Sequence, residues 1–499
     1  MMANYPIWEP CVANTILIAV VSILHVFVSH FAIGGGIYLV VAETWARRKN
    51  DLDHLAYLER FSRFFALITL VFGAVTGVGI WVTIGLIHPT GAKWLVNNFV
   101  WGWAIDWVFF FVEIAAALIY YYGWKRLSAS THLAVGWIYF IAAWMSLFVI
   151  NGILTFMLTP GEWLATGSFW DGFFNPTFWP SLVFRTAVAL ALAGLYAVFT
   201  VAGEKKTDLK IRILRHNGML ILTALALAVP CGWWYFHAVP ETIRSAILPG
   251  SIPATALQIM LFCAALLFVL TLLGAVLFPR HAGYVSGAIL LLCALLSVGG
   301  FEWAREALRK PYIIHGFLYS NGLLAADAQK APFIQPHTIS FSAGSRGRDL
   351  FLANCRSCHT ISGYMSLTDR MAGWDKEYIQ NSLPRLQYYI GRMPPFAGNK
   401  ADAALLATYL SSIADPDPLS ADSSLSEPDK AQIVFHRRCG VCHTMDGVRA
   451  VGASFQGLDA GDAKATIKSL PDLTEAMPPF TGSKEELDLL IRYLTGGGQ

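Results

Sequence analysis

Charged residues are scarce in this sequence. Asp, Glu, Lys and Arg make up 14% of its 499 residues, whereas a soluble chain carries about 25%. The formal net charge of +3 is too small to indicate a nucleic-acid partner. The first apolar run also lacks a basic leading segment and a small-residue cleavage site, so we expect a retained helix rather than a signal peptide. These absences indicate an integral membrane protein.

In place of charge, the sequence has apolar runs of about 20 residues, the length needed to cross about 30 Å of hydrocarbon. They dominate residues 1–311, and from about Ala326 the composition becomes that of a soluble domain. Eight spans are predicted, over residues 15–43, 63–87, 99–123, 133–157, 180–202, 216–237, 256–278 and 282–303. We therefore expect an all-α fold, with an eight-helix transmembrane bundle followed by a soluble region.

Lysine and arginine are distributed unequally among the loops that join these spans. Thirteen lie in the first, third, fifth and seventh loops, whereas only Lys93 and Arg244 lie in the second, fourth and sixth. Because basic residues stay on the cytoplasmic side, the odd loops are predicted to be inside. The N-terminus and the C-terminal region are then both predicted to be outside.

Two short motifs mark the C-terminal region: CRSCH at 355–359 and CGVCH at 439–443. The pattern C-x-x-C-H is the attachment signal of haem c, which forms thioethers with both cysteines and takes the histidine as iron ligand. A single copy is also compatible with a redox dithiol or a zinc site. The motifs predict two covalent haems c, held by Cys355, Cys358, His359, Cys439, Cys442 and His443.

The two motifs belong to a tandem repeat with an offset of 84 residues, since MPPF at 393–396 recurs at 477–480. Each motif histidine therefore precedes a methionine by 34 residues. A copy that keeps Cys, Cys, His and Met in register preserves a six-coordinate haem site. We expect Met393 and Met477 to be the sixth ligands. Three other methionines do not recur in this way: Met365, Met371 and Met445.

Both repeats resemble class I cytochrome c domains, because each opens and closes with a predicted helix around these ligands. The first is predicted over residues 342–414 and the second over 426–499, with a linker of Pro, Ser and Asp over 415–425. Residues 313–341 are expected to link them to the membrane domain, residues 1–312. The predicted fold is thus a transmembrane bundle followed by two small α-helical cytochrome c domains.

Ionisable residues inside the predicted spans are costly and therefore indicate function. They are His25, His30, Asp106, Glu113, Arg185 and the group Glu302, Arg305, Glu306 and Arg309. His25, Asp106 and Arg185, together with Met260, lie near the predicted outer ends of the odd spans, and Glu306 lies at the outer end of the eighth. Structural explanations remain open as well. Asp106 and Arg185 could form a buried ion pair, and the glutamates and arginines near residue 306 could pair along one helix.

Over residues 5–315 the sequence resembles subunit I of the cytochrome bd quinol oxidase superfamily. The resemblance rests on LHVFVSHFAIGGGIYLVVAET, AIDWVFFFVE, LQIMLFCA and AREALRKPY, which occur in order along the chain. It implies haem b, haem d or both in the membrane domain. The catalytic residues it implies are His25, Asp106, Glu113 and Glu306, of which His25 and Glu306 bind high-spin haem iron. Glu113 is matched to a proton-path glutamate, and Arg309 to a residue near the haem.

The chain also departs from that family. Met260 matches the ligand of a low-spin haem b, but the partner histidine is replaced by Arg185, a poor iron ligand. That haem is then absent or bound differently, with His237 as one alternative. Asp106 stands where the family has glutamate. The family's long quinol-binding loop and ninth helix are missing, and the haem c region follows instead.

Together these features predict a membrane-bound respiratory electron-transfer oxidoreductase. It would pass electrons between external haems c and buried high-spin haems and reduce dioxygen or a related small oxidant. A quinol:cytochrome c oxidoreductase and an anchored dihaem shuttle of a larger respiratory complex remain alternatives. The resemblance implies a second membrane subunit, an external redox protein as partner, and the bacterial inner membrane, with the cytochrome c domains on the periplasmic side.

Overall fold

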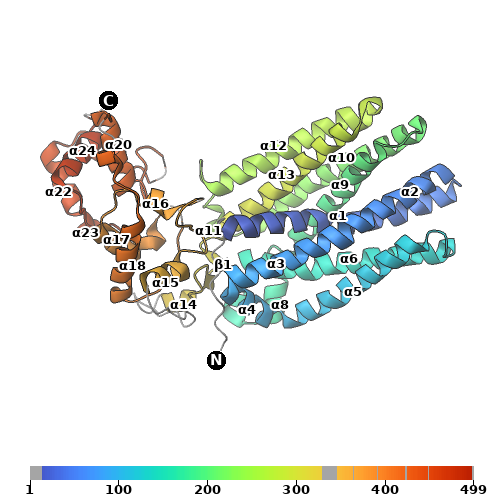
Figure 1. Ribbon diagram of the computed structural model, residues 1–499, viewed down its shortest axis with the longest axis horizontal. Helices are drawn as coiled ribbons and strands as arrows, with labels where there is room; N and C mark the ends of the chain where they lie inside the picture. The colour runs from blue at the N-terminus through green and yellow to red at the C-terminus, as the bar shows by residue number, and fades with distance from the viewer. Residues whose placement is uncertain are drawn as a thin grey trace. The chain divides into compact units, whose positions relative to one another are not determined.

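The computed structural model describes residues 14–328, 346–363, 365–389, 392–421, 424–447 and 449–496 (Figure 1). Within it the chain forms two compact units. The membrane unit comprises Ile18–Gly85 and Pro89–Arg309, and the C-terminal unit comprises mainly the residues from Lys310 onward. The chain therefore leaves the membrane unit where its last apolar helix ends.

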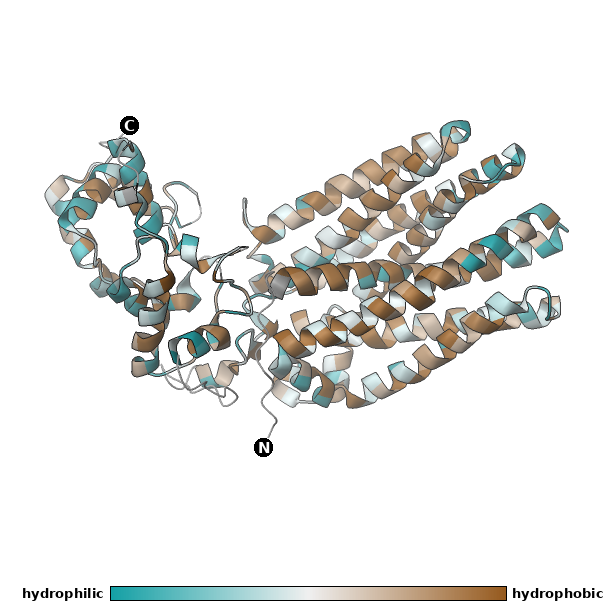
Figure 2. Cartoon of the chain, in the orientation of Figure 1, coloured by the Kyte–Doolittle hydropathy of each residue, from teal (hydrophilic) through white to brown (hydrophobic). Residues whose placement is uncertain are grey.

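Eight helical segments in the described part of the chain are long and apolar enough to cross a membrane, which confirms the predicted number. They are α1 (Asn14–Arg48), α2–η1–α3 (Leu52–Ala66, Leu67–Gly73 and Ala74–Ile87), α5 (Val100–Gly123), α6 (Ala129–Leu158), α9 (Phe178–Val201), α10 (Thr207–Ala238), α12–η2 (Ile252–Thr271 and Leu272–Leu277) and α13 (Tyr284–Arg309). Figure 2 shows them as long, mainly hydrophobic rods. Several extend beyond the predicted spans because polar turns continue the helix, as Arg47 and Arg48 do in α1.

Helix α9 is the most enclosed of the eight. In its most apolar stretch 67% of the residues are buried, compared with 17–33% in the other spans. Small residues make this possible, because they allow helix backbones to approach closely. At the crossing with α1, a Cβ atom on Gly34 would lie 1.9 Å from the carbonyl oxygen of Ala189. Only glycine fits at position 34.

Short helices connect the spans. They are α4 (Pro89–Asn98), α7 (Trp163–Thr166), α8 (Phe169–Phe173), α11 (Glu241–Arg244) and η3 (Pro279–His281). After α8, the buried Asn175 amide donates to the Gly152 carbonyl at 3.2 Å and to the Thr155 hydroxyl at 2.9 Å. These bonds fix the loop backbone to α6. They thereby define the position at which α9 starts.

The C-terminal unit begins with the antiparallel pair β1 (Tyr312–Ile314) and β2 (Leu318–Tyr319), followed by α14 (Ala325–Ala328). These elements occupy the start of the predicted linker. The rest of that linker, from residue 329, lies outside the described residues.

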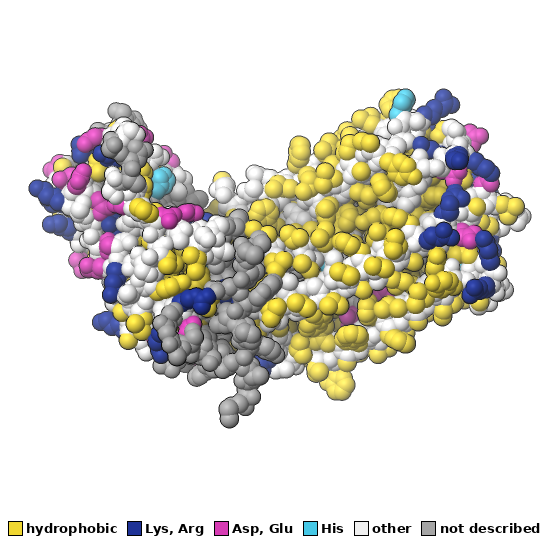
Figure 3. All heavy atoms as spheres, viewed as in Figure 1, with side chains coloured by type: hydrophobic (Ala, Val, Ile, Leu, Met, Phe, Trp, Pro, Cys, Tyr) yellow, Lys and Arg dark blue, Asp and Glu magenta, His cyan; other side chains and the backbone are white. Residues whose placement is uncertain are grey.

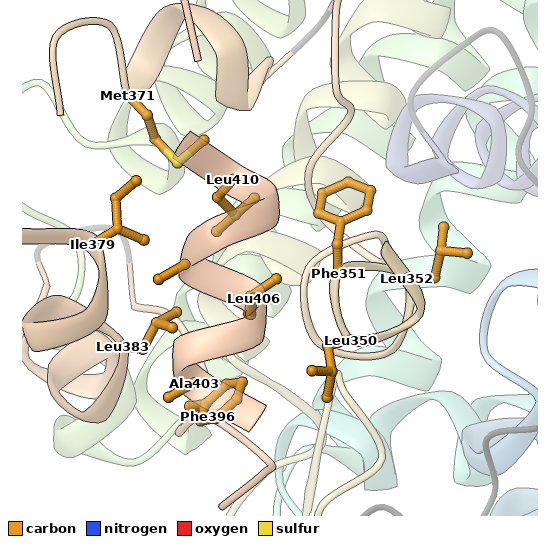
Figure 4. Close-up of a cluster of buried hydrophobic side chains, with 11 residues drawn as sticks. Leu350, Phe351, Leu352, Met371, Ile379, Leu383, Phe396, Ala403, Leu406 and Leu410 are labelled. Atoms are coloured by element: carbon orange, nitrogen blue, oxygen red, sulfur yellow. The ribbon is translucent and has the colours of Figure 1, made fainter. Parts of the chain in front are cut away.

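Two small helical domains follow. The first c unit contains α15 (Arg346–Asn354), α16 (Leu367–Arg370), α17 (Lys376–Ser382), η4 (Leu383–Tyr388) and α18 (Lys400–Ile413). After α19 (Pro418–Ala421), the second c unit contains α20 (Glu427–Arg438), α21 (Gly452–Phe455), α22 (Ala460–Lys468), α23 (Leu470–Leu473) and α24 (Lys484–Leu494). Each has its own core; Figure 4 shows the first, where Phe351 of α15 and Leu406 and Leu410 of α18 are buried together with Met371.

The structure repeats with the same offset as the sequence. Helices α17 and α22 begin 84 residues apart, as do α18 and α24. Both α18 and α24 start with a capping box, formed by Asn399 with Asp402 and by Ser483 with Glu486. The predicted fold class, a transmembrane bundle with two small helical domains, is confirmed. The exact domain boundaries stay predictions.

Candidate haem sites

Each C-x-x-C-H motif forms the same tight turn after a helix. The His359 amide donates to the Cys355 carbonyl at 2.8 Å, and the His443 amide donates to the Cys439 carbonyl at 2.9 Å. Within the described residues, none of the four motif cysteines, Cys355, Cys358, Cys439 and Cys442, is part of a disulfide. The turn therefore presents two thiols and one imidazole from a single short segment.

The two histidines are oriented in the same way. His359 Nδ1 lies 3.1 Å from the carbonyl oxygen of Met365, and His443 Nδ1 lies 3.0 Å from that of Arg449. Donation from Nδ1 leaves Nε2 as the nitrogen with a lone pair, which is how an iron-binding histidine is held. Met365 and Arg449 both have positive φ angles, 54° and 53°, a conformation uncommon for residues other than glycine. The backbone of Met365, rather than its sulfur, is the repeated feature.

The surroundings of the thiols disfavour a reactive dithiol. Burial raises the pKa of the Cys355 and Cys439 thiols to about 12, whereas metal binding and redox exchange use the thiolate. Two thiols beside an oriented histidine fit covalent haem c.

The loops that carry the predicted sixth ligands are tied to the motif helices. In the first c unit, Asn354 bonds the backbone of Ala397 twice, at 3.0 and 2.8 Å, which fastens the segment following Met393 to the end of α15. In the second c unit, Arg438 takes the place of Asn354 and donates to Thr481 at 3.5 Å, just beyond Met477. Both methionines are partly buried. Their role as iron ligands stays a prediction.

The first c unit also contacts the motif of the second. The Tyr378 hydroxyl donates to the carbonyl oxygen of Arg438 at 3.1 Å, and the Arg438 guanidinium lies 4.8 Å from the Tyr378 ring centroid. Arg449 donates to the Tyr388 carbonyl oxygen at 2.6 Å. Residues on both sides of Cys439 are thus held by α17 and η4 of the preceding unit.

In the membrane unit, His25 lies on α1 against α3. Its Nδ1 is 3.2 Å from the Thr76 hydroxyl, and a Cβ atom on Gly77 would lie 3.1 Å from its ring. As in the c units, a hydrogen bond at Nδ1 leaves Nε2 as the nitrogen that could bind iron. The arrangement fits a haem ligand, and that role stays a prediction.

The predicted carboxylates of α5 have partners on α6. The Ser146 hydroxyl donates to Asp106 at 2.6 Å, and the Tyr139 hydroxyl donates to Glu113 at 3.1 Å. The possible ion pair between Asp106 and Arg185 does not form. Arg185 instead reaches α13.

Arg185, on α9, forms a buried ion pair with Glu302 at 2.7 Å, and Glu302 also accepts from Arg305 at 3.0 Å. Arg185 and Glu302, together with His30, Met260 and other residues of α1, α9, α12 and α13, surround a cavity of about 50 Å³. An arginine has only N–H donors and no lone pair for a metal. Arg185 and Met260 therefore do not fit the pair of iron ligands expected for a low-spin haem.

The sequence offers His237 as an alternative ligand for that iron. His237 lies at the end of α10, where its ring contacts Trp233 with the centroids 4.4 Å apart, and it is not among the residues around this cavity. His30 does line the cavity, and its Nδ1 lies 2.7 Å from the Val26 carbonyl oxygen. The sequence marked His30 only as an ionisable residue of the first span.

Glu306, predicted to bind high-spin haem iron, lies one turn beyond this cluster on α13. Its carboxylate accepts from Nε of Arg309 at 3.1 Å, so the two residues matched to the haem region are neighbours. The side chain of Glu306 is 36% exposed, whereas that of Arg309 is 8% exposed. A partly open carboxylate beside a buried guanidinium fits a haem ligand next to a propionate partner, which stays a prediction.

Comparisons with known proteins agree with this arrangement. Residues 15–242 match the family described as cytochrome bd terminal oxidase subunit I. Residues 342–410 and 426–494 each match the family described as cytochrome c oxidase, cbb3-type, subunit III. Among solved structures, the bd oxidase from Geobacillus thermodenitrificans is similar, with a TM-score of 0.55 and 16% identity over 62% of this chain and 89% of that chain. That likeness shows a shared fold. No curated protein matches the chain.

Proposed function

We propose a specific route for electrons through this chain. The proposal starts from the match of residues 15–242 to cytochrome bd terminal oxidase subunit I and of residues 342–410 and 426–494 to a cytochrome c family. The protein is a respiratory electron-transfer oxidoreductase. It takes electrons from a cytochrome c-type donor through its haems c and delivers them to buried high-spin haems, where dioxygen or a related small oxidant is reduced. The observation that carries this proposal is the pair of motif turns whose histidines are oriented identically.

The cofactors are proposed from the donor sets. Two haems c would be held by the motif cysteines, with His359 and His443 on one side of the iron and Met393 and Met477 on the other. In the membrane, His25, Asp106 and Glu306 would hold haem b, haem d or both. These groups supply one-electron transfer and the binding of the small oxidant. The protein's part is to fix the irons, to keep water out and to bring protons to Glu113.

We further propose that the cytochrome c domains lie on the periplasmic face of the bacterial inner membrane. The basic loops support this orientation, because Lys and Arg are retained on the cytoplasmic side. Figure 3 shows Lys and Arg side chains gathered at one end of the apolar surface of the membrane unit. A second membrane subunit and an external redox protein complete the proposed complex, by analogy with bd oxidases.

The ion pair between Arg185 and Glu302 bears on the source of electrons. It occupies the place where the family's low-spin haem ligand is expected, and the long quinol-binding loop is missing. Both features favour a cytochrome c-type donor over a quinol. Electrons would then enter the protein through the haems c.

The test is a haem inventory with carbon monoxide binding. Protein purified in detergent, analysed by pyridine haemochrome, should contain two haems c per chain together with haem b or d. Carbon monoxide should perturb only the non-covalent haem. His25→Ala should abolish that perturbation. His216→Ala should retain it, because His216 is exposed in the N-terminal part of α10.

Two results would contradict the proposal. Haem c alone in the wild-type protein would make the chain an anchored shuttle. Reduction of the haems c by a quinol, sensitive to a quinone-site inhibitor, would make it a quinol:cytochrome c oxidoreductase.

A further inference from the structure

The two c units meet through one surface of the first unit, formed by α17 and η4. On α17, the Tyr378 hydroxyl donates to the Arg438 carbonyl oxygen at 3.1 Å, and Asp375 accepts from the Arg438 guanidinium at 3.1 Å. On η4, the Tyr388 carbonyl oxygen accepts from Arg449 at 2.6 Å. We call this surface the α17–η4 face. Its partners are two basic residues that flank the second haem c motif.

The α17–η4 face also reaches the motif itself and the loop opposite it. The Tyr388 carbonyl oxygen lies 3.8 Å from Sγ of Cys442. Arg385 donates to the Glu475 carbonyl oxygen at 2.8 Å, two residues before Met477. The face therefore contacts both segments from which the second haem c would be held.

The second c unit repeats this surface with α22 and α23. Asp375 is the N-cap of α17 and accepts from the Tyr378 amide at 2.7 Å, and Asp459 is the N-cap of α22 and accepts from the Asp462 amide at 2.8 Å. Asp462 therefore occupies the position that Tyr378 has in the first unit. We call this second surface the α22–α23 face.

A short motif matches the other half of the two faces. SLPRL at 382–386 leads into η4, and SLPDL at 469–473 leads into α23. Asp472 therefore stands in the place of Arg385, and the charge at this position is reversed. Leu473 follows it and is 60% exposed, more than any other large hydrophobic side chain in the described parts of the two c units.

The α22–α23 face is acidic around this leucine. Its exposed carboxylates are Asp459, Asp462 and Asp472. The lysines of α22, Lys464 and Lys468, are two and six residues beyond Asp462 and so do not share its side of the helix. An apolar centre with a charged rim is the usual composition of a transient protein interface. The complementary partner carries basic residues around an apolar patch.

The first c unit is engaged on two sides. The Asn321 amide, just after β2, donates to the Pro395 carbonyl oxygen at 2.9 Å, two residues beyond Met393. The segment that holds Asn321 continues directly from α13, the last membrane span. The first unit is thus connected to the membrane domain through this segment and to the second unit through the α17–η4 face. The α22–α23 face is the exposed copy of the same surface.

We propose that the α22–α23 face is the docking site of the electron donor, a small cytochrome c-type protein with basic residues around its haem edge. The donor would bind as the second c unit binds the first, with its basic side chains against Asp462 and Asp472 and its haem edge beside the Met477 loop. One electron passes from the ferrous donor to the ferric second unit, and no bond forms or breaks. This rests on the proposed function and makes the second c unit the point of entry.

The experiment measures electron transfer from a basic probe, cytochrome c in which zinc replaces the iron. Its photoexcited triplet state gives an electron to a ferric haem, so the triplet decay reports the reaction. The acceptor is the full-length protein, purified in detergent and fully oxidised. The test variant combines Asp462→Lys with Asp472→Lys. Asp488→Lys is the control, because Asp488 is also exposed in the second c unit but lies on α24.

We expect the double variant to quench the triplet at least about tenfold more slowly than the wild-type protein at low ionic strength, because charges at an interface control the association rate. Asp488→Lys should stay within about twofold of wild type, and about 0.5 M salt should bring all three together. A probe with succinylated lysines should not distinguish wild type from the double variant. Asp472→Asn, expected to slow quenching about threefold, replaces the double variant if that protein contains less haem c than the control.

Two results would overturn the proposal, and they differ. If wild type and the variants of the α22–α23 face contain equal haem c and quench the triplet equally at low ionic strength, the donor does not dock on this face, and the proposed function stands. If the wild-type protein contains no haem c, the proposed function fails and this proposal fails with it.

Discussion

The carboxylate of Glu302 accepts a hydrogen bond at 2.7 Å from Arg185, a residue 117 positions earlier in the chain. Arg305, one turn away on the same helix, binds the other oxygen at 3.0 Å. The group joins α9 to α13 deep in the membrane unit, since Arg185 is 3% exposed and Glu302 is 7% exposed. Glu302 is therefore the centre of a buried ion cluster that includes the residue standing in place of an expected haem ligand.

Removing Glu302 should be severely destabilising. Glu302→Gln leaves the buried Arg185 guanidinium without a counter-charge, and breaking a buried pair in this way costs about 3–5 kcal/mol. We expect a clearly lower midpoint in thermal unfolding followed by size-exclusion chromatography. Glu59→Gln is the control, because its partner Lys125 is 82% exposed and such a pair is worth at most about 1 kcal/mol. Equal midpoints for the two variants would show that the cluster does not stabilise the bundle.

The crossing of α1 and α9 should tolerate no side chain at position 34. In Gly34→Ala the added Cβ would lie 1.9 Å from the Ala189 carbonyl oxygen, so the helices must separate. We expect little or no monodisperse protein after extraction into detergent. Gly85→Ala is the matched control, since nothing lies within 4 Å of its added Cβ, and alanine stabilises a helix by up to about 1 kcal/mol over glycine. Similar yields of the two variants would contradict the close packing.

The sixth ligand of the first haem c can be tested by its reduction potential. Met393→His should lower the potential of one haem c by on the order of 0.1–0.3 V and leave the other unchanged, because histidine–methionine ligation raises the potential. Potentiometric titration followed at the haem c absorbance measures this. Met371→Leu is the control, since Met371 is 4% exposed within the first core and leucine costs less than about 1.5 kcal/mol there. If the potential shifts in Met371→Leu and not in Met393→His, Met393 is not the sixth ligand of this haem.

The two capping acids of the repeat should differ in importance. Glu486 is buried and pairs with both Arg437 and Arg438, so Glu486→Gln should destabilise the second c unit by about 3–5 kcal/mol. Asp402 pairs with Arg346, whose side chain is 44% exposed, at 2.7 Å, and Asp402→Asn should cost less, about 1–2 kcal/mol. Urea unfolding followed at the haem c absorbance distinguishes them. A larger loss for Asp402→Asn would contradict this assignment.

Local patterns were sufficient to predict much of the molecule. Apolar length predicted the eight spans, and the offset of 84 residues predicted two helical domains with paired haem motifs. Both depend on residues close together in the sequence. The partner of Arg185 was not predictable in this way, because it depends on how α9 and α13 pack. Glu302 carried no assigned role until that packing was seen.

The contacts between α5 and α6 show the same limit. The spacing of Asp106 and Glu113 indicated that both side chains lie on one face of the same helix. Their partners Ser146 and Tyr139 are ordinary residues of an apolar span, and only the register of two antiparallel helices brings them opposite the carboxylates. A search for polar residues spaced by seven on adjacent spans would have found them.

The contacts of Tyr378 and Tyr388 with the second haem motif have a consequence for the timing of electron transfer. Two redox domains on a flexible tether meet by diffusion, and the rate of exchange then falls as the tether lengthens. Here the first domain is fastened to Arg438 and Arg449, on either side of the second motif. In the proposed dihaem protein, packed side chains would therefore set the gap between the two irons, and electron passage across it would be a first-order step. Extra residues inserted in the connecting segment would leave that step unchanged.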